Sequence, residues 1–184
     1  MSKPVIVAVD DDPQVLGAVR RDLRSKYAAD YRIVSVGSGA EAISVVSDLK
    51  GRGDTVALFL VDQRMPGMEG TELLIETRAL YPDARRVLLT AYADTEAAIS
   101  AINEADLDHY LMKPWDPPDE RLFPVLDDLL NDWWANTPPP YDGIRVIGTR
   151  WSPATYEVKD FLARNRIPYR FLDIKRDAEG RAIV

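Results

Sequence analysis

The sequence predicts an α/β protein with a doubly wound, five-stranded parallel sheet, followed by a short βαβ segment. From residue 4 to residue 136, short apolar runs alternate with amphipathic stretches, which is the pattern of repeated βα units. One run, residues 56–61, contains no polar residue, as a strand covered by helices on both faces requires. We therefore expect this strand at the centre of the sheet.

Each element follows from a local pattern. Short runs rich in Val, Ile, Leu or Tyr are the expected strands, at residues 5–9, 31–36, 56–61, 86–90 and 108–112. Apolar side chains recur at helical spacing between them, in residues 15–23, 42–49, 73–80 and 97–102. Asp12 suits the N-cap of the first helix and Pro13 its first position. A fifth helix is expected over residues 118–135, where Pro124 either kinks it or marks its true start.

A proline-rich connector divides the chain. We expect a first domain over residues 1–136, a linker over 137–143 and a βαβ segment over 144–184. In this segment, residues 144–148 and 169–174 are the expected strands, and a helix over 152–166 is expected to be capped by Ser152. A segment of about 44 residues is near the lower limit for independent folding, so we expect it to be incomplete or packed on something.

Composition excludes several functions. The chain has 184 residues, no cysteine and a single histidine, His109, to which we assign no role. Disulfides, thiolate metal sites and thiol nucleophiles are therefore excluded. The net charge of -7 repels nucleic-acid backbones, so we expect no nucleic-acid partner. The longest apolar run is too short to cross a membrane and the N-terminus is too brief for a secretory signal, so we expect a cytoplasmic protein.

Polar residues stand where ligands bind in an open parallel sheet, beyond the carboxyl ends of the strands. Asp10 and Asp11 follow the first expected strand, and Asp62 follows the third. If these strands are neighbours, the carboxylates converge and repel one another unless a cation neutralises them, and an oxygen-only set suits Mg²⁺. Thr90 and Lys113, at the ends of the fourth and fifth strands, complete the parts that phosphoryl transfer needs.

The corresponding chemistry is formation of an acyl phosphate, with Asp62 as the nucleophile, Lys113 as a positive charge and Thr90 as a donor to a phosphoryl oxygen. Each residue alone has a simpler interpretation. The aspartates could only cap a helix, Asp62 could only begin a turn, and Lys113 could be a solvated side chain. Their coincidence at four strand ends favours the phosphoryl-transfer interpretation.

Residues 4–135 resemble the receiver domain of bacterial two-component response regulators. The resemblance rests on Val9-Asp10-Asp11-Asp12-Pro13, Asp62-Gln63-Arg64-Met65-Pro66-Gly67-Met68-Glu69-Gly70, Leu89-Thr90-Ala91 and Tyr110-Leu111-Met112-Lys113-Pro114-Trp115. It implies a flavodoxin-like strand order 2-1-3-4-5. It also implies that Asp62 accepts a phosphoryl group from a sensor histidine kinase or phosphotransfer protein.

The resemblance further implies that Asp10, Asp11, Asp62 and the Arg64 carbonyl hold Mg²⁺, and that Lys113, before a cis Pro114, contacts the phosphate. Thr90 and Tyr110 correspond to the family's switch pair, which reshapes the face made by the fourth helix, fifth strand and fifth helix. A homodimer through this face or through the tail is possible under this interpretation. Arg64 and Tyr92 occupy positions that influence water access to the phosphoryl group.

Residues 144–174 resemble the opening βαβ unit of a glutaredoxin or thioredoxin-like domain, as in receivers joined to a thioredoxin reductase. Ser152 and Thr155 stand at the cysteine positions of that family, so its dithiol activity does not carry over. The alternative function is a regulatory or docking fragment of such a redox enzyme, with no redox chemistry of its own. Trp133, Trp134 and Trp151 are expected to mark a dimer or interdomain surface, or equally the core on which the tail docks.

Overall fold

The computed structural model describes residues 3–91, 106–137 and 143–183. Contacts divide the chain into two compact units, Met1–Thr137 and Pro138–Val184. The helix expected over 97–102 and Tyr92 lie outside the described residues. Within the described part of the chain, no helix is long and apolar enough to span a membrane.

The first unit is built on a five-stranded sheet. Its strands are β1 (Val5–Val9), β2 (Arg32–Val36), β3 (Val56–Asp62), β4 (Arg85–Thr90) and β5 (His109–Met112). All neighbouring pairs are parallel, in the order β2-β1-β3-β4-β5. Every residue of β3 is buried, and the predicted central strand and fold class are confirmed.

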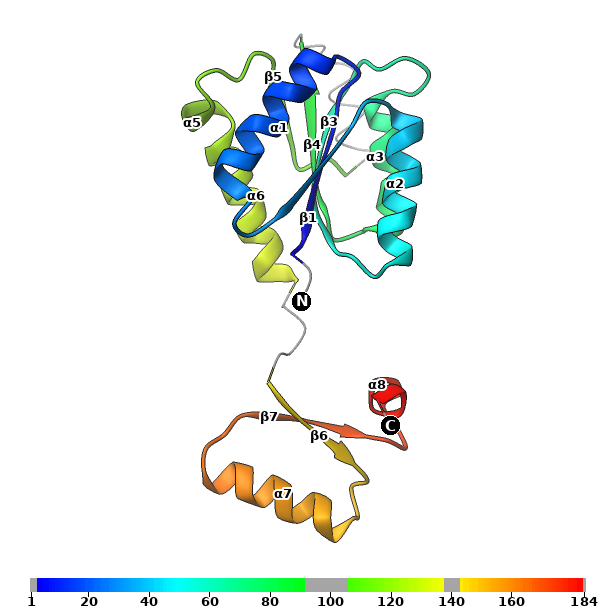
Figure 1. The fold of residues 1–184 in the computed structure, drawn as a ribbon, viewed down its shortest axis with the longest axis vertical. Helices are drawn as coiled ribbons and strands as arrows, with labels where there is room; N and C mark the ends of the chain where they lie inside the picture. Colours follow the sequence, from blue (N-terminus) through cyan, green and yellow to red (C-terminus); the bar gives the residue numbers. More distant parts are fainter. Residues whose placement is uncertain (1–2, 92–105, 138–142, 184) are drawn as a thin grey trace. The chain divides into compact units, whose positions relative to one another are not determined.

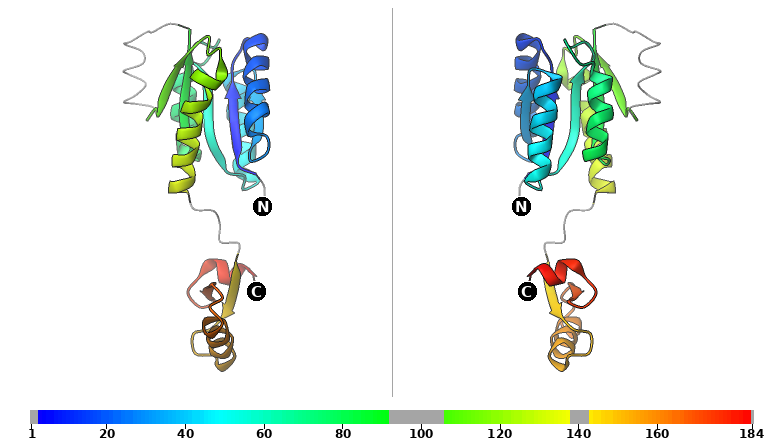
Figure 2. Two further views of the ribbon diagram at one scale, coloured as in Figure 1. Left: turned by 90° about the vertical axis from the view of Figure 1, so that its left-hand side faces the viewer. Right: turned by 90° about the vertical axis from the view of Figure 1, so that its right-hand side faces the viewer.

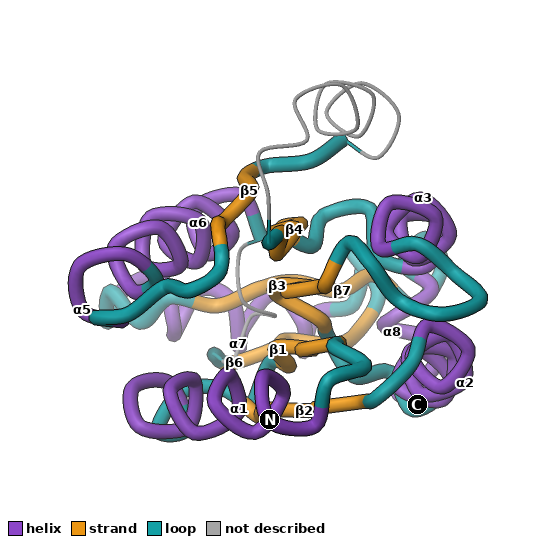
Figure 3. Tube along the Cα trace, turned by 90° about the horizontal axis from the view of Figure 1, so that it is seen from above, coloured by secondary structure: helices purple, strands orange, loops and turns teal. Residues whose placement is uncertain are grey.

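Helices cover both faces of this sheet (Figures 1 and 2). Seen from above, α1 and α6 lie on one side and α2 and α3 on the other (Figure 3). Their bounds are α1 (Pro13–Tyr27), α2 (Gly39–Gly51), α3 (Gly70–Leu80), α5 (Pro118–Arg121) and α6 (Phe123–Asn136). As predicted, Asp12 is the N-cap of α1, where its carboxylate accepts from the amides of Gln14 and Val15.

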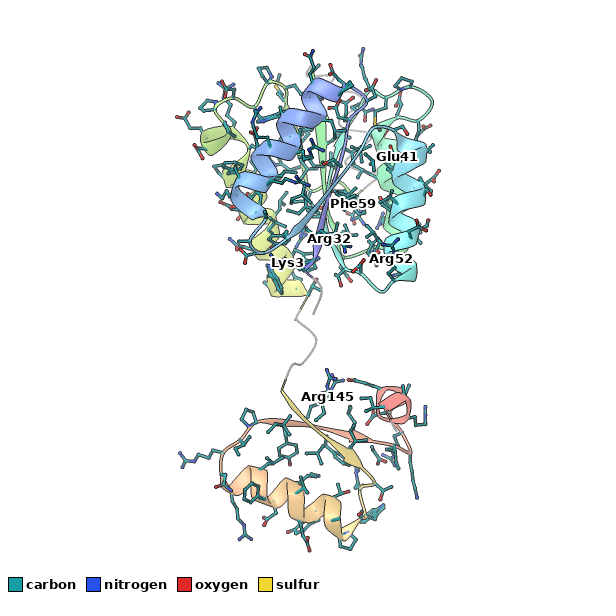
Figure 4. The ribbon with its side chains drawn as sticks, viewed as in Figure 1. Lys3, Arg32, Glu41, Arg52, Phe59 and Arg145 are labelled. Carbon is teal, nitrogen blue, oxygen red and sulfur yellow. The ribbon has the colours of Figure 1, made fainter. Side chains whose placement is uncertain are left out.

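The core has two layers because strand side chains alternate between the faces. Ile6 and Leu58 pack toward α1 and α6. Phe59, labelled in Figure 4, packs toward α2 and α3 with Leu73 and Leu74. Each of these side chains is almost fully buried, which contributes roughly 1.5 to 3 kcal/mol per residue. The resulting rigid sheet holds the carboxyl ends of its strands in fixed positions.

For the last helix of this unit, one expectation is confirmed and one needs correction. The helical stretch over 118–135 is divided at Leu122, and α6 begins at Phe123 with Pro124 in its first turn, as one of the two alternatives for Pro124 predicted. Proline there lacks only an amide hydrogen that has no helical partner, so it marks the true start of the helix. Trp133 is 3% exposed and packs in the core, one turn beyond Leu129 and Leu130.

The interpretation of Trp133 as a surface residue is therefore wrong. Trp134 is 39% exposed and Trp151 is 87% exposed.

The second unit contains the predicted βαβ arrangement. Its elements are β6 (Ile144–Gly148), α7 (Pro153–Arg164), β7 (Tyr169–Asp173) and a short α8 (Ala178–Ile183), which the sequence pattern did not predict. β6 and β7 are parallel. Ser152 stands at the N-cap of α7, but its side chain makes no capping hydrogen bond, contrary to expectation. The helix instead opens with the backbone bond from Tyr156 to the Ser152 carbonyl.

Candidate functional site

Two buried aspartates meet at the carboxyl edge of the first unit's sheet. Asp62 is the last residue of β3, and Asp10 directly follows β1, whose Val9 is paired with Val61. Their exposed fractions are 1% for Asp10 and 6% for Asp62. Carboxylates are rarely buried without a compensating charge, so this edge requires a positive partner.

Lys113 provides that partner in this structure. It follows β5, and its Nζ lies 2.6 Å from Asp10 Oδ2 and 2.6 Å from Asp62 Oδ1. Its backbone amide donates to the carbonyl of Thr90, which fixes the start of the loop to β4. The Lys113–Pro114 peptide bond is cis, as the resemblance implied. One ammonium group therefore bridges two strands that are far apart in the sequence.

The backbone orients the same carboxylates. Asp10 Oδ1 accepts from the amide of Asp12 at 3.0 Å, and Asp62 Oδ2 accepts from the amide of Arg64 at 3.1 Å. Behind Asp62, Gly70 begins α3 so close to the strand that an added Cβ would lie 2.2 Å from the Asp62 carbonyl oxygen. The glycine therefore permits α3 to start directly against the site.

Asp11 completes a group of possible metal ligands. One carboxylate oxygen from each of Asp10, Asp11 and Asp62 lies within 4.8 Å of the others. Asp11 is exposed, so the group opens to solvent. Three hard oxygen donors with an open side match the preference of Mg²⁺, which binds few carboxylates and keeps several waters. The donor set and its spacing fit such an ion.

The local environment also shifts two pKa values. Burial raises the pKa of Asp62 above its usual value, although the Lys113 ammonium acts in the opposite direction. For Lys113, burial lowers the pKa, but hydrogen bonds to Asp10 and Asp62 outweigh it, and the net pKa is raised. Lys113 therefore stays charged through the neutral pH range.

The other expected residues lie around this centre. Thr90 ends β4 and is half-buried, and the side chain of Arg64 is exposed. Tyr110 is 45% exposed on β5, with its ring stacked on His109 at 6.0 Å. The tyrosine ring thus lies outside the core.

Three hydrogen bonds near the site were not anticipated. Trp115 Nε1 donates to Asp22 Oδ2 at 3.0 Å, which ties the loop after Lys113 to α1. Gln63, directly after Asp62, accepts from the amide of Thr71 and donates to Glu69. In the sequence, Asp22 is only an acid within an amphipathic helix, and Gln63 is only an amide beside the candidate nucleophile. Both features are too common to identify these two residues as part of the site.

The chain is similar to known proteins over most of its first unit. Residues 6–122 match the family model of the response regulator receiver domain. The chain is 35% identical over 112 residues to the hydrogenase transcriptional regulatory protein HoxA of Cupriavidus necator, covering 61% of this chain and 21% of HoxA. It thus spans about a fifth of the length of that curated relative.

Solved structures with the same fold include a CheY-like response regulator receiver domain protein from Methanospirillum hungatei. The match to it has a TM-score of 0.63 and 27% sequence identity, and it covers 74% of this chain and all of the Methanospirillum chain. Another is the response regulator TrrA of Thermotoga maritima in complex with Mg²⁺-BeF, with a TM-score of 0.54 at 28% identity. That match covers 68% of this chain and 98% of TrrA.

Proposed function

Because the chain belongs to the response regulator receiver domain family, we propose that Asp62 accepts a phosphoryl group from a sensor histidine kinase or phosphotransfer protein. The observation that carries this proposal is the bridge from Lys113 Nζ to Asp10 and Asp62, at 2.6 Å each. It supports an arrangement in which a nucleophilic carboxylate, an acidic pair and a fixed cation share one edge of the sheet. The protein acts as a phosphoacceptor in signalling and not as a conventional enzyme.

The proposed Mg²⁺ ligands are Asp10, Asp11, Asp62 and the Arg64 carbonyl. The three carboxylates lie within the range that one ion can bridge, and the Mg²⁺-BeF complex of the related TrrA supports a divalent cation here. When bound, Mg²⁺ would neutralise negative charge on the phosphoryl oxygens.

The chain's own groups carry out the transfer of the phosphoryl group to Asp62. A carboxylate oxygen of Asp62 attacks phosphorus and forms an O–P bond, while the P–N bond to the donor histidine breaks and its electron pair stays on the imidazole nitrogen. Lys113 keeps its proton and moves from the carboxylates to a phosphoryl oxygen. The backbone bond from the Arg64 amide holds Asp62 in place during attack.

We further propose that Thr90 and Tyr110 read out the phosphoryl group. Thr90 would donate to a phosphoryl oxygen, and Tyr110, now 45% exposed, would turn inward. Phosphorylation would thereby shift the population between two existing states of the β5 face. Met112, 51% exposed on the same strand, adds apolar surface through which a homodimer could form or a downstream partner could bind.

For the whole chain, we propose a receiver over residues 1–136, a linker over 137–143 and a thioredoxin-like segment over 144–184. The parallel β6 and β7 joined by α7 support the last assignment. Without cysteine this segment would dock or regulate a redox partner, and a homodimer through the tail is the competing possibility.

The test is incubation of the full chain with acetyl phosphate and Mg²⁺, followed by intact-mass measurement. We expect the mass of one phosphoryl group on the wild type, none without Mg²⁺, and none on Asp62→Asn. An Asp11→Asn variant should need more Mg²⁺ for the same yield. A phosphoryl mass that persists in Asp62→Asn would remove Asp62 from its proposed role.

A further inference from the structure

The loop that carries Lys113 is fixed to α1 by one tryptophan. Trp115 lies two residues after Lys113, is 8% exposed and packs in the core layer of α1 and α6. Its indole Nε1 donates to Asp22 Oδ2 at 3.0 Å. The Asp22 side chain is itself only 12% exposed, so this bond is partly buried.

The bond matters because packing between α1 and the loop is incomplete. A hollow of about 390 Å³ lies between them, with Val15, Ala18, Pro114 and Trp115 in its wall. Trp115 and Asp22 both lie in the wall of this hollow, and the direct bond between them favours one loop conformation, since a largely buried indole N–H left without an acceptor costs roughly 1 to 3 kcal/mol. Asp22 also pairs with Arg21, but that arginine is 74% exposed and adds little.

We propose that Trp115 and Asp22 are positioning residues for Lys113, an inference that rests on the proposed phosphoryl transfer to Asp62. The loop is held by one hydrogen bond before Pro114 and by another after it. The Lys113 amide is bonded to Thr90 on β4, and the Trp115 indole is bonded to Asp22 on α1. Lys113 has a long, flexible side chain, so a fixed backbone origin is what limits where its ammonium can reach.

The test compares variants that keep or remove this bond in the full chain. Asp22→Leu removes the acceptor, Asp22→Asn keeps a carbonyl oxygen, and Trp115→Phe keeps a ring but loses the N–H. With acetyl phosphate and saturating Mg²⁺, we expect Asp22→Leu and Trp115→Phe to lower the maximal phosphorylation rate roughly tenfold, equivalent to about 1.4 kcal/mol. Asp22→Asn should stay close to the wild-type rate.

A matched control is Trp134→Phe, which removes a second indole hydrogen bond, from Trp134 Nε1 to Tyr31, far along α6. It should leave the rate unchanged. In a Lys113→Ala background, Asp22→Leu should have almost no further effect, because the bond acts through Lys113. A purely structural role would lower the melting temperature without this dependence on Lys113.

The outcomes separate this inference from the proposed function. If the wild type gains no phosphoryl group, the proposed function fails. If the wild type is phosphorylated and Asp22→Leu matches Asp22→Asn in rate, the positioning role is overturned while the proposed function stands. Comparison of these two Asp22 variants decides the question even if Trp115→Phe does not fold.

Discussion

The ammonium of Lys113 lies 2.6 Å from Oδ1 of Asp62, and the same nitrogen lies equally close to Asp10. Two buried carboxylates thus share one cation, which directly follows the edge strand β5. The pair explains how the site can be acidic and yet folded before any metal is added. It also makes the site's stability depend on what neutralises it.

Removal of Lys113 should therefore destabilise the protein in a way that Mg²⁺ partly reverses. Lys113→Met leaves Asp10 and Asp62 buried without a positive partner, which we expect to cost roughly 3 kcal/mol of unfolding free energy. Urea unfolding with and without Mg²⁺ measures this, and Mg²⁺ should stabilise the variant more than the wild type. Lys3→Met, at an exposed lysine bonded to the Ala28 carbonyl, is the control. A Lys113→Met variant as stable as the wild type without Mg²⁺ would contradict the expectation.

The pKa of Asp62, raised mainly by burial, makes stability depend on pH. Above the ordinary value of 3.8, the folded state holds this proton more tightly than the unfolded state does. This carboxyl group therefore lowers stability as the pH rises through that window. We expect Asp62→Asn to gain stability relative to the wild type between pH 4 and neutral pH, without Mg²⁺. The measurement is unfolding free energy against pH for both proteins, and a constant difference would refute the prediction.

Gly70 should be intolerant of even one added carbon. A Cβ at this position would meet the backbone of Asp62 at 2.2 Å, so either α3 or Asp62 must move. We expect Gly70→Ala to cost about 1 to 3 kcal/mol and, under the proposed function, to slow phosphorylation of Asp62. Gly17→Ala is the matched control, because nothing lies within 4 Å of its Cβ position inside α1. It should stabilise the protein by about 0.5 to 1 kcal/mol. Equal effects of the two substitutions would count against the close approach.

Tyr27 should make the first unit sensitive to alkali. Burial, followed by a hydrogen bond to Asp127, raises the pKa of its hydroxyl above the ordinary value of 10.0. The unfolded chain loses this proton first, so folding stability falls as the pH rises past that value. We expect Tyr27→Phe to cost about 1 kcal/mol at neutral pH and less in alkali, measured by urea unfolding. Tyr156→Phe, at a side chain that is 70% exposed, is the control at neutral pH and should cost almost nothing there. If the cost of Tyr27→Phe in unfolding free energy does not change with pH, the Tyr27 hydroxyl is not the cause of the sensitivity to alkali.

The fold and the meeting of Asp10, Asp62 and Lys113 could be predicted because both follow from general rules of parallel sheets. Strand ends in such sheets share one edge, and an all-apolar strand must be central. These rules use only the order and polarity of segments.

Features that depend on local geometry could not be predicted in this way. The six-residue α8 is too short to give a periodic pattern. The bond from Trp115 to Asp22 joins residues 93 positions apart through a loop with a cis peptide bond. No spacing rule relates two such positions.

In the proposed function, Asp62 itself carries the phosphoryl group. Borohydride reduction of the acetyl phosphate-treated chain converts an aspartyl phosphate to homoserine, and peptide mass analysis then locates the converted residue. We predict homoserine at position 62, dependent on Mg²⁺ and lost when Lys113 is replaced by methionine. Homoserine at Asp10 or Asp11 instead, or no conversion in a chain that has gained the phosphoryl mass, would contradict it.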